Sequence, residues 1–176
     1  MATEIKLGKV AGLSLSAMPS AIAGMALLWI LLSAFAIGLL SLSPIEAIAG
    51  GLIAVALHGI SEFLHQWGHA RAARRLGHPM VGLRFWGLLS TSLYPADEPA
   101  LPADIHIRRA LGGPITSLVC SVVAAVITLA LRPLGGTPWL IAAFVFLDNL
   151  FVLGLGSFLP LGFTDGSTLL HWWGKR

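Results

Sequence analysis

Charged side chains are scarce in this chain of 176 residues, at 11% against 56% for hydrophobic residues. Because an ordinary soluble domain contains about 25% charged residues, this composition excludes one and indicates a membrane protein. Cysteine is scarcer still, since Cys120 stands alone and no intramolecular disulfide can form. The formal net charge of +3 is small, and the positive residues follow a membrane topology, so we expect no nucleic-acid partner.

Long apolar runs dominate the sequence instead. A helix needs about 20 apolar residues to cross a hydrocarbon core of about 30 Å. Four runs of this kind occur, at about residues 21–42, 44–76, 109–131 and 139–158. We therefore predict an all-α membrane protein, with an N-terminal cytoplasmic lead at residues 1–20 and a single transmembrane domain at residues 21–176. The first run exceeds the roughly 7–15 residues of a signal-peptide core, so we expect a retained helix.

Basic residues lie almost entirely on one side of this predicted topology. Those on that side are Lys6, Lys9, Arg71, Arg74, Arg75, Arg84, Arg108, Arg109, Lys175 and Arg176. Only Arg132 lies on the other side, so by the positive-inside rule both termini are expected to face the cytoplasm. The short loops favour a prokaryotic cell membrane, and the lipid bilayer is an expected partner. No feature of the sequence predicts an oligomeric state.

The second predicted span carries a stripe of polar side chains. His58, Glu62, His65 and His69 follow one another at spacings of four, three and four residues, which places them on one face of a helix. Polar groups within a membrane are costly, and such a face must contact protein or water. A lone histidine would be interpreted as a hydrogen-bonded core residue. The aligned pair His65 and His69, however, has the spacing of two ligands of one metal ion.

A catalytic zinc site requires a third protein ligand, and depth in the membrane selects it. His65 and His69 lie close to the cytoplasmic end of their span, at about 1.5 Å of rise per residue. Asp165 lies near the same end, so we expect it to be the third ligand of a Zn²⁺ ion. A helix N-cap is the simpler alternative for Asp165, and one residue can do both. Asp148 lies farther out, level with His58, and these two are expected to form a buried polar pair.

The residue after His65 decides the expected chemistry. In the metalloprotease pattern H-E-x-x-H, that residue is a glutamate that takes a proton from zinc-bound water. Here the segment reads His65-Gln66-Trp67-Gly68-His69, and the Gln66 amide has no useful basicity. Since a general base contributes about 10²–10⁴-fold to the rate, we expect strongly reduced proteolysis from this chain.

Three segments resemble, in order and spacing, the signatures of the site-2 protease family, membrane-embedded zinc metalloproteases that cut transmembrane substrates. These segments are FLHQWGHARAARRLGH, GGPITSL and SFLPLGFTDG, and the resemblance covers about residues 50–172. It implies a site-2-protease-like helical core, with His65, His69 and Asp165 as zinc ligands and Gln66 at the position of the catalytic glutamate. It also implies a membrane-associated β-hairpin at Val81–Tyr94, able to hold an extended substrate by strand addition.

Two serines also depart from the family pattern. Ser157 and Ser117 stand where the family has asparagine, whereas Pro160 and Gly166 match the third signature. We expect Ser157, Pro160 and Gly166 to support the site. Two explanations of Gln66 stay open, an engineered inactivation and a natural divergence. The serines favour divergence, because engineering normally leaves the other signature positions unchanged.

The leading interpretation is an intramembrane zinc metalloprotease that cleaves membrane-protein or transmembrane-peptide substrates. Besides these two explanations of Gln66, Glu62 could take over as the base or as a metal ligand. It lies one turn before His65, although its side chain starts at a different height from the family's glutamate. The alternative function is a pseudoprotease that binds membrane segments or partners without cleaving them. A di-iron membrane hydroxylase is disfavoured, because it needs more histidines than the six present.

Overall fold

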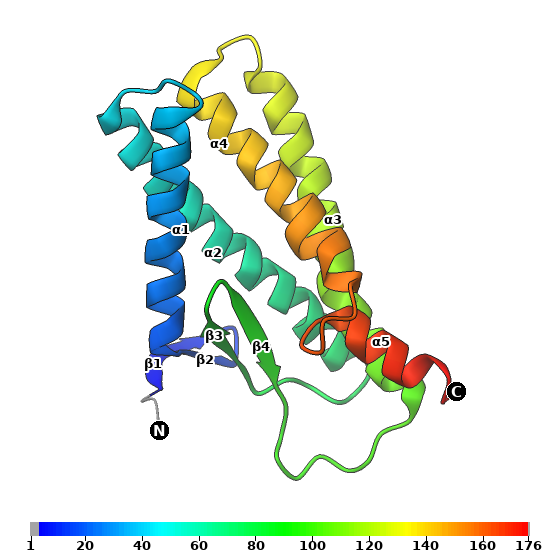
Figure 1. Cartoon of the computed structure of the whole chain (residues 1–176). Coiled ribbons are helices and arrows are strands. Elements are labelled where there is room, and N and C mark those ends of the chain that lie inside the picture. Colours follow the sequence, from blue (N-terminus) through cyan, green and yellow to red (C-terminus); the bar gives the residue numbers. More distant parts are fainter. Residues whose placement is uncertain (1–3, 176) are drawn as a thin grey trace.

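In the computed structural model, which describes residues 4–175, long helices run alongside one another and a small β-sheet lies at one end of them (Figure 1). The long helices are α1 (Pro19–Gly38), α2 (Pro44–Arg75), α3 (Ala103–Leu131) and α4 (Gly136–Leu147). Helix α4 continues through a π-helical segment, η1 (Asp148–Leu155), and a 3₁₀ turn, η2 (Gly156–Phe158), and a short helix, α5 (Asp165–Trp173), follows. Arg176, one of the basic residues of the predicted topology, lies outside the described residues.

Among the described residues, four helices, counting α4 with η1 and η2 as one, are long and apolar enough to cross a membrane. Their outer faces leave large apolar side chains exposed, among them Ile45, Val122 and Leu129. Large exposed apolar side chains on helices of membrane-spanning length fit surfaces that face lipid rather than water. The predicted architecture of four transmembrane helices with a short β-hairpin is confirmed.

Two helix ends differ from the expected spans by about one turn or more. Helix α3 begins at Ala103, well before residue 109, because Pro102 has the extended backbone of an N-cap and the first turns are helical although they carry charge. Helix α1 ends at Gly38 rather than near residue 42. There Ser41 adopts a φ of 54°, which turns the chain towards α2.

Helix α2, which carries the polar stripe, has strong signals at both ends. Ser43 and Glu46 form a capping box: the Ser43 hydroxyl accepts from the Glu46 backbone amide at 3.4 Å, and the Glu46 carboxylate accepts from the Ser43 amide at 3.2 Å. Pro44 suits the first helical position, because its fixed φ matches the helix. At the other end Gly77 has a φ of +78°, a left-handed conformation that glycine adopts without steric cost, just after the helix stops at Arg75.

Helices α2 and α3 approach each other closely through two glycines. A Cβ atom at Gly68 would overlap the Gly112 carbonyl oxygen, and one at Gly112 would lie 2.5 Å from the Gly68 carbonyl oxygen. Small residues of this kind let membrane helices approach backbone to backbone. The contact lies between His65 and His69 in the sequence of α2, so it brings α3 against the predicted ligands.

The sheet has its strands in the order β1 (Ile5–Val10), β2 (Leu13–Ala17), β3 (Gly82–Trp86) and β4 (Leu89–Leu93). The predicted hairpin at Val81–Tyr94 is present as β3 and β4, but it is half of a larger sheet, because β2 pairs in parallel with β3. The N-terminal lead thus contains a second hairpin, turned at Ala11 and Gly12, whose φ values are 49° and 86°. Strand β4 is the last strand of the sheet, so one of its edges is not paired with another strand of the described residues.

A small apolar core joins the sheet to the last turns of α2. Its buried members are Leu13, Ala70, Ala73, Met80 and Leu83. Phe63 and Trp67 pack against this core. Trp67, in the middle of the histidine motif, therefore serves packing, and the core fixes the sheet beside the polar stripe.

Candidate metal centre

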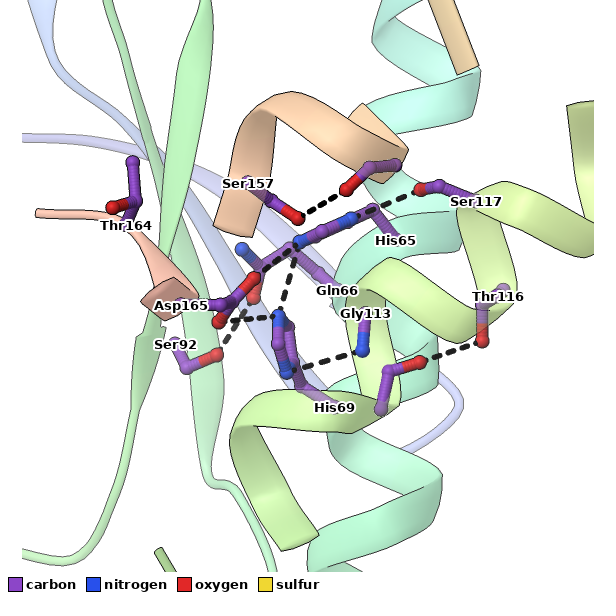
Figure 2. Close-up of polar contacts among 12 residues, drawn as sticks. His65, Gln66, His69, Ser92, Gly113, Thr116, Ser117, Ser157, Thr164 and Asp165 are labelled. Carbon is purple, nitrogen blue, oxygen red and sulfur yellow. Dashed lines mark hydrogen bonds and ion pairs between the residues drawn. The ribbon is translucent and has the colours of Figure 1, made fainter. Parts of the chain in front are cut away.

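The three predicted ligands lie together at one point of the molecule. His65 and His69 come from α2, and Asp165 reaches them from the first residue of α5 (Figure 2). The Nε2 atoms of the two imidazoles are 3.0 Å apart. Asp165 Oδ2 lies 3.3 Å from His65 Nε2, and Asp165 Oδ1 lies 3.3 Å from His69 Nε2. Both histidines are buried.

Helix α3 holds the second nitrogen of each imidazole. His69 Nδ1 donates to the Arg109 carbonyl oxygen at 2.8 Å. Because a carbonyl only accepts, this bond needs a proton on Nδ1 and leaves the Nε2 lone pair of the neutral ring facing the cluster. The Gly113 amide also points at Nδ1, at a longer distance of 3.3 Å, and competes with this arrangement (Figure 2). His65 Nδ1 lies 2.9 Å from the Ser117 hydroxyl, which orients this ring in a comparable way. Ser117, expected only as a departure from the family's asparagine, is therefore in contact with a candidate ligand.

The spacing of the three donor groups fits a tetrahedral metal ion. Ligand atoms at about 2.0–2.1 Å from a four-coordinate zinc stand about 3.3–3.4 Å apart, and the observed separations are 3.0 and 3.3 Å. Two lone pairs and a carboxylate at this distance repel one another, so either a proton or a metal cation lies between them. Gly113 of α3 leaves room, because a Cβ atom there would overlap the Nε2 atoms of both histidines. Within residues 4–175, this is the cluster whose donor atoms are grouped closely enough to hold a metal ion.

Asp165 is a charged ligand candidate although it is largely buried. Burial by itself raises the pKa of its carboxyl, but His69 and His65, when their Nε2 atoms carry protons, outweigh that effect and lower this pKa to about 2. A bound cation would take the place of those protons. The carboxylate is therefore ionised near neutral pH, as a ligand of a divalent cation must be. The alternative interpretation of Asp165 as an N-cap is wrong, because Thr164 occupies the N-cap position and Asp165 is the first helical residue.

The other expected supporting residues shape the backbone around the three candidate ligands. Pro160 is exposed and lies just beyond η2, where the helix stops. Gly166 lets α5 approach this point, because a Cβ atom there would overlap the Phe158 carbonyl oxygen. Ser157 lines the cavity described below, but its hydroxyl donates within its own helix, to the Gly154 carbonyl at 2.7 Å.

A cavity of about 610 Å³ opens beside the three candidate ligands, which form part of its wall. The rest of the wall comes from α2, β4, α3, α5 and the chain around η2, and includes Glu62, Gln66, Ser90, Tyr94 and Trp172. A volume of this size is typical of sites that bind small molecules or a few residues of a peptide.

Gln66 uses its whole side-chain amide to hold strand β4. Its Oε1 accepts from the Ser92 hydroxyl at 2.7 Å (Figure 2), and its Nε2 donates to the Ser90 carbonyl at 3.3 Å. A glutamate at this position would have no proton to donate to the Ser90 carbonyl. The amide therefore forms both hydrogen bonds to β4, of which a carboxylate could form only the one from Ser92.

His58 and Asp148 form the expected buried pair, outside the cavity wall. His58 Nδ1 lies 3.0 Å from Asp148 Oδ2, and His58 Nε2 lies 2.8 Å from the Leu88 carbonyl oxygen in the hairpin turn. Because a carboxylate and a carbonyl both accept, the two bonds together require a proton on each ring nitrogen, and His58 is then an imidazolium. The pair joins α2, η1 and the hairpin rather than the candidate metal ligands.

Arg109 belongs to the site, although its place in the sequence indicated only a topological role. Its buried guanidinium donates to the Glu98 carboxylate at 2.5 and 2.9 Å and to the His78 carbonyl at 2.6 Å, and it lies 4.1 Å from the centre of the Tyr94 ring. These bonds lower the pKa of Glu98. Since the backbone carbonyl of Arg109 holds His69, this clamp fixes the start of α3 and the connection from β4 around the site.

No protein-family model matches the sequence, and no curated protein sequence matches it significantly. The fold is similar to that of a site-2 protease from Methanocaldococcus jannaschii, with a TM-score of 0.66. The match covers 96% of this chain and 70% of that protein, at 17% sequence identity. The chain is thus an integral membrane protein with a site-2-protease-like fold, and the resemblance indicated by the three sequence segments is confirmed at the level of the fold.

Proposed function

We propose that the protein is an intramembrane zinc metallopeptidase that hydrolyses peptide bonds in transmembrane or membrane-adjacent segments. The observation that carries this proposal is the convergence of His65, His69 and Asp165, with donor groups 3.0 to 3.3 Å apart, on the wall of the cavity. The fold supports it, because the structurally similar protein is a site-2 protease.

In this proposal the two imidazole nitrogens and the Asp165 carboxylate hold the metal, which matches the three protein ligands of catalytic zinc sites. Zinc held there would polarise a scissile carbonyl and lower the pKa of a water molecule, the two effects that peptide hydrolysis needs. The Ser117 hydroxyl and the Arg109 carbonyl hold the rings in place. Such outer contacts are worth about 10–100-fold in metal affinity.

An extended peptide is the substrate form that the cavity favours. Strand β4 is the last strand of the sheet, and its residues Leu89, Ser90, Thr91 and Ser92 line the cavity. A strand edge binds an extended segment through backbone hydrogen bonds. A transmembrane helix already satisfies its own backbone groups, so it must unwind locally before it can bind in this way.

The proposed orientation places the sheet and the metal centre at the cytoplasmic face of a prokaryotic cell membrane. The last helix, α5, lies at the end of the bundle that carries the sheet, as does the first strand, β1 (Figure 1). The basic end of α2, with Arg74 and Arg75 in its last turn, lies there too. This arrangement satisfies the positive-inside rule.

A pseudoprotease is the second candidate, and the state of Gln66 favours it. The amide cannot act as a base, and both of its polar atoms are hydrogen-bonded to β4. If no other group accepts the proton, the expected loss of rate is about 10²–10⁴-fold. A pseudoprotease would bind transmembrane peptides, cleave none of them, and gain no activity from Gln66→Glu.

Zinc content tests the metal centre without knowledge of the substrate. We expect the chain, purified in detergent, to contain about one zinc per molecule, as in other catalytic sites with three protein ligands. The variant Asp165→Ala should lose most of it, whereas Asp97→Ala, which removes an exposed aspartate from the loop after β4, should retain it. A parent chain without zinc, or equal zinc in all three proteins, would contradict the proposal.

A further inference from the structure

Glu62 is a buried carboxyl in the wall of the cavity, and nothing in the metal centre accounts for it. Glu62 is 2% exposed and lies in α2, a helix long and apolar enough to cross the membrane. One carboxyl oxygen, Oε1, accepts from the Ser90 hydroxyl at 2.5 Å. The other, Oε2, has no hydrogen-bond partner within residues 4–175. A buried acceptor without a donor costs free energy, and in a native protein such a group calls for a functional explanation.

A regular pattern of contacts fixes Glu62 relative to the edge strand. His58, Glu62 and Gln66, four residues apart on α2, contact Leu88, Ser90 and Ser92, which alternate along the hairpin. Four helical residues rise about 6 Å and two strand residues about 6.6 Å, so the two repeats stay in step. In this ladder of contacts, the amide of Gln66 supplies the hydrogen-bond donor for the Ser90 carbonyl.

The same ladder brings a carboxyl group to the cavity one turn away from the family's position. Residues four apart on a helix have Cβ atoms about 5–6 Å from each other, so Glu62 is an immediate neighbour of Gln66. Glu62 lines the cavity together with His65, His69 and Asp165. It therefore borders the space in which water and a peptide bond would meet, with its Oε2 atom covered by neighbouring side chains.

We propose that Glu62 is the general base of this chain and takes the role that Gln66 cannot perform. The inference rests on the proposed function. The Glu62 carboxylate accepts one proton from water as the water oxygen bonds to the scissile carbonyl carbon. The carboxyl then gives this proton to the amide nitrogen as the C–N bond breaks. One water molecule is consumed for each peptide bond, and Glu62 returns to its starting state.

Four variants separate this role from a structural one. Glu62→Gln keeps the size of the side chain and an acceptor for Ser90 but removes the base. Ser90→Ala removes the hydrogen bond and leaves the carboxylate. Glu62→Gln with Gln66→Glu moves the carboxyl to the family's position. Glu46→Gln is the matched control, because the same change on the same helix keeps the capping pattern and lies far from the cavity.

The activity assay uses synthetic single-span peptides of about 20 apolar residues, each with a central glycine pair and a quenched fluorophore, in proteoliposomes. We expect Glu62→Gln to lower the cleavage rate by about 10²–10⁴-fold, Ser90→Ala to lower it much less, and Glu46→Gln to leave it unchanged. The double variant should regain at least a tenth of the parent rate. Zinc content should stay near one per chain in every case.

A second readout does not depend on cleavage. A peptidyl hydroxamic acid binds zinc as its anion and passes its proton to a neighbouring base, so its affinity reports that base. We expect Glu62→Gln to weaken hydroxamate binding by about tenfold or more, the scale of one hydrogen bond to a charged group. Glu46→Gln should leave the affinity unchanged.

Several outcomes would overturn the assignment of Glu62. These are equal rates for Glu62→Gln and the parent, equal losses for Glu62→Gln and Ser90→Ala, and loss of zinc from Glu62→Gln, which would make Glu62 a ligand or a structural residue. The assignment of Glu62 would also fail if the parent were inactive and Gln66→Glu restored cleavage. That result would still support the proposed function as a protease. If neither the parent nor Gln66→Glu cleaves any peptide, the proposed function itself fails, and the pseudoprotease takes its place.

Discussion

Replacing Gly113 by alanine should abolish metal binding without weakening the helix that carries it. Alanine is favoured over glycine inside a helix by about 1 kcal/mol, so α3 itself should not be destabilised. The added methyl, however, would overlap Nε2 of both His65 and His69 and lie 2.7 Å from His65 Cε1. Non-bonded carbon atoms prefer about 3.5–4.0 Å, so the imidazole would have to retreat by about 1 Å.

A retreat of this size exceeds what a metal site tolerates, since ligand distances are held to within about 0.2 Å. We therefore expect zinc affinity to fall by more than the roughly 100-fold that loss of an outer contact costs. The assay is zinc stoichiometry and chelator competition in detergent, with Gly59→Ala as the matched control, because no atom lies within 4 Å of a Cβ at that position of α2. Equal zinc affinity in Gly113→Ala and the parent would refute the placement of the metal between the two imidazoles.

Three further predictions concern the contacts around the site. His58→Gln leaves the Asp148 carboxylate buried without a cation, so we expect the free energy of unfolding to fall by about 3–5 kcal/mol, measured as a lower Tm. Adding Asp148→Asn should restore most of this stability, and equal Tm values for the single and the double variant would contradict the prediction. Hydrogen bonds from Arg109 lower the pKa of Glu98 below its usual 4.5, so this clamp contributes its full stability above pH 4.5 and loses it as the pH falls through the lower, folded value. Hydrogen exchange in residues 95–102 should therefore rise on acidification below pH 4.5, but show no such step in Glu98→Gln. Ser117→Ala should weaken zinc binding by about 10–100-fold. Unchanged chelator competition would show that Ser117 does not orient His65 for the metal.

Local patterns made the helical part of the site predictable. The spacing of His65 and His69 fixes their common face as soon as the segment is helical, because helix geometry alone sets it. Asp165 and the pairing of His58 with Asp148 followed from depth along straight helices, which the bilayer constrains. The structure brings these groups together as expected.

Contacts between distant segments were not predictable in this way. Strand β2 pairs with β3 across more than sixty residues of sequence, and the alternating pattern of Ile5–Ala17 does not say which strand it joins. Burial of Arg109 depends on Glu98 in an irregular connection, which no periodic pattern positions. The sequence showed that Gln66 cannot act as a base. It did not show the hydrogen bonds from Gln66 to β4, because these depend on the register between a helix and a strand.

X-ray absorption at the zinc edge of the purified protein would identify the ligands of the proposed metal centre. We predict zinc bound by two imidazole nitrogens and carboxylate oxygen at about 2.0–2.1 Å, with no sulfur. Asp165→Ala should lose zinc or one oxygen ligand. Zinc with more than two imidazoles, or a spectrum unchanged in Asp165→Ala, would contradict the assignment of His65, His69 and Asp165.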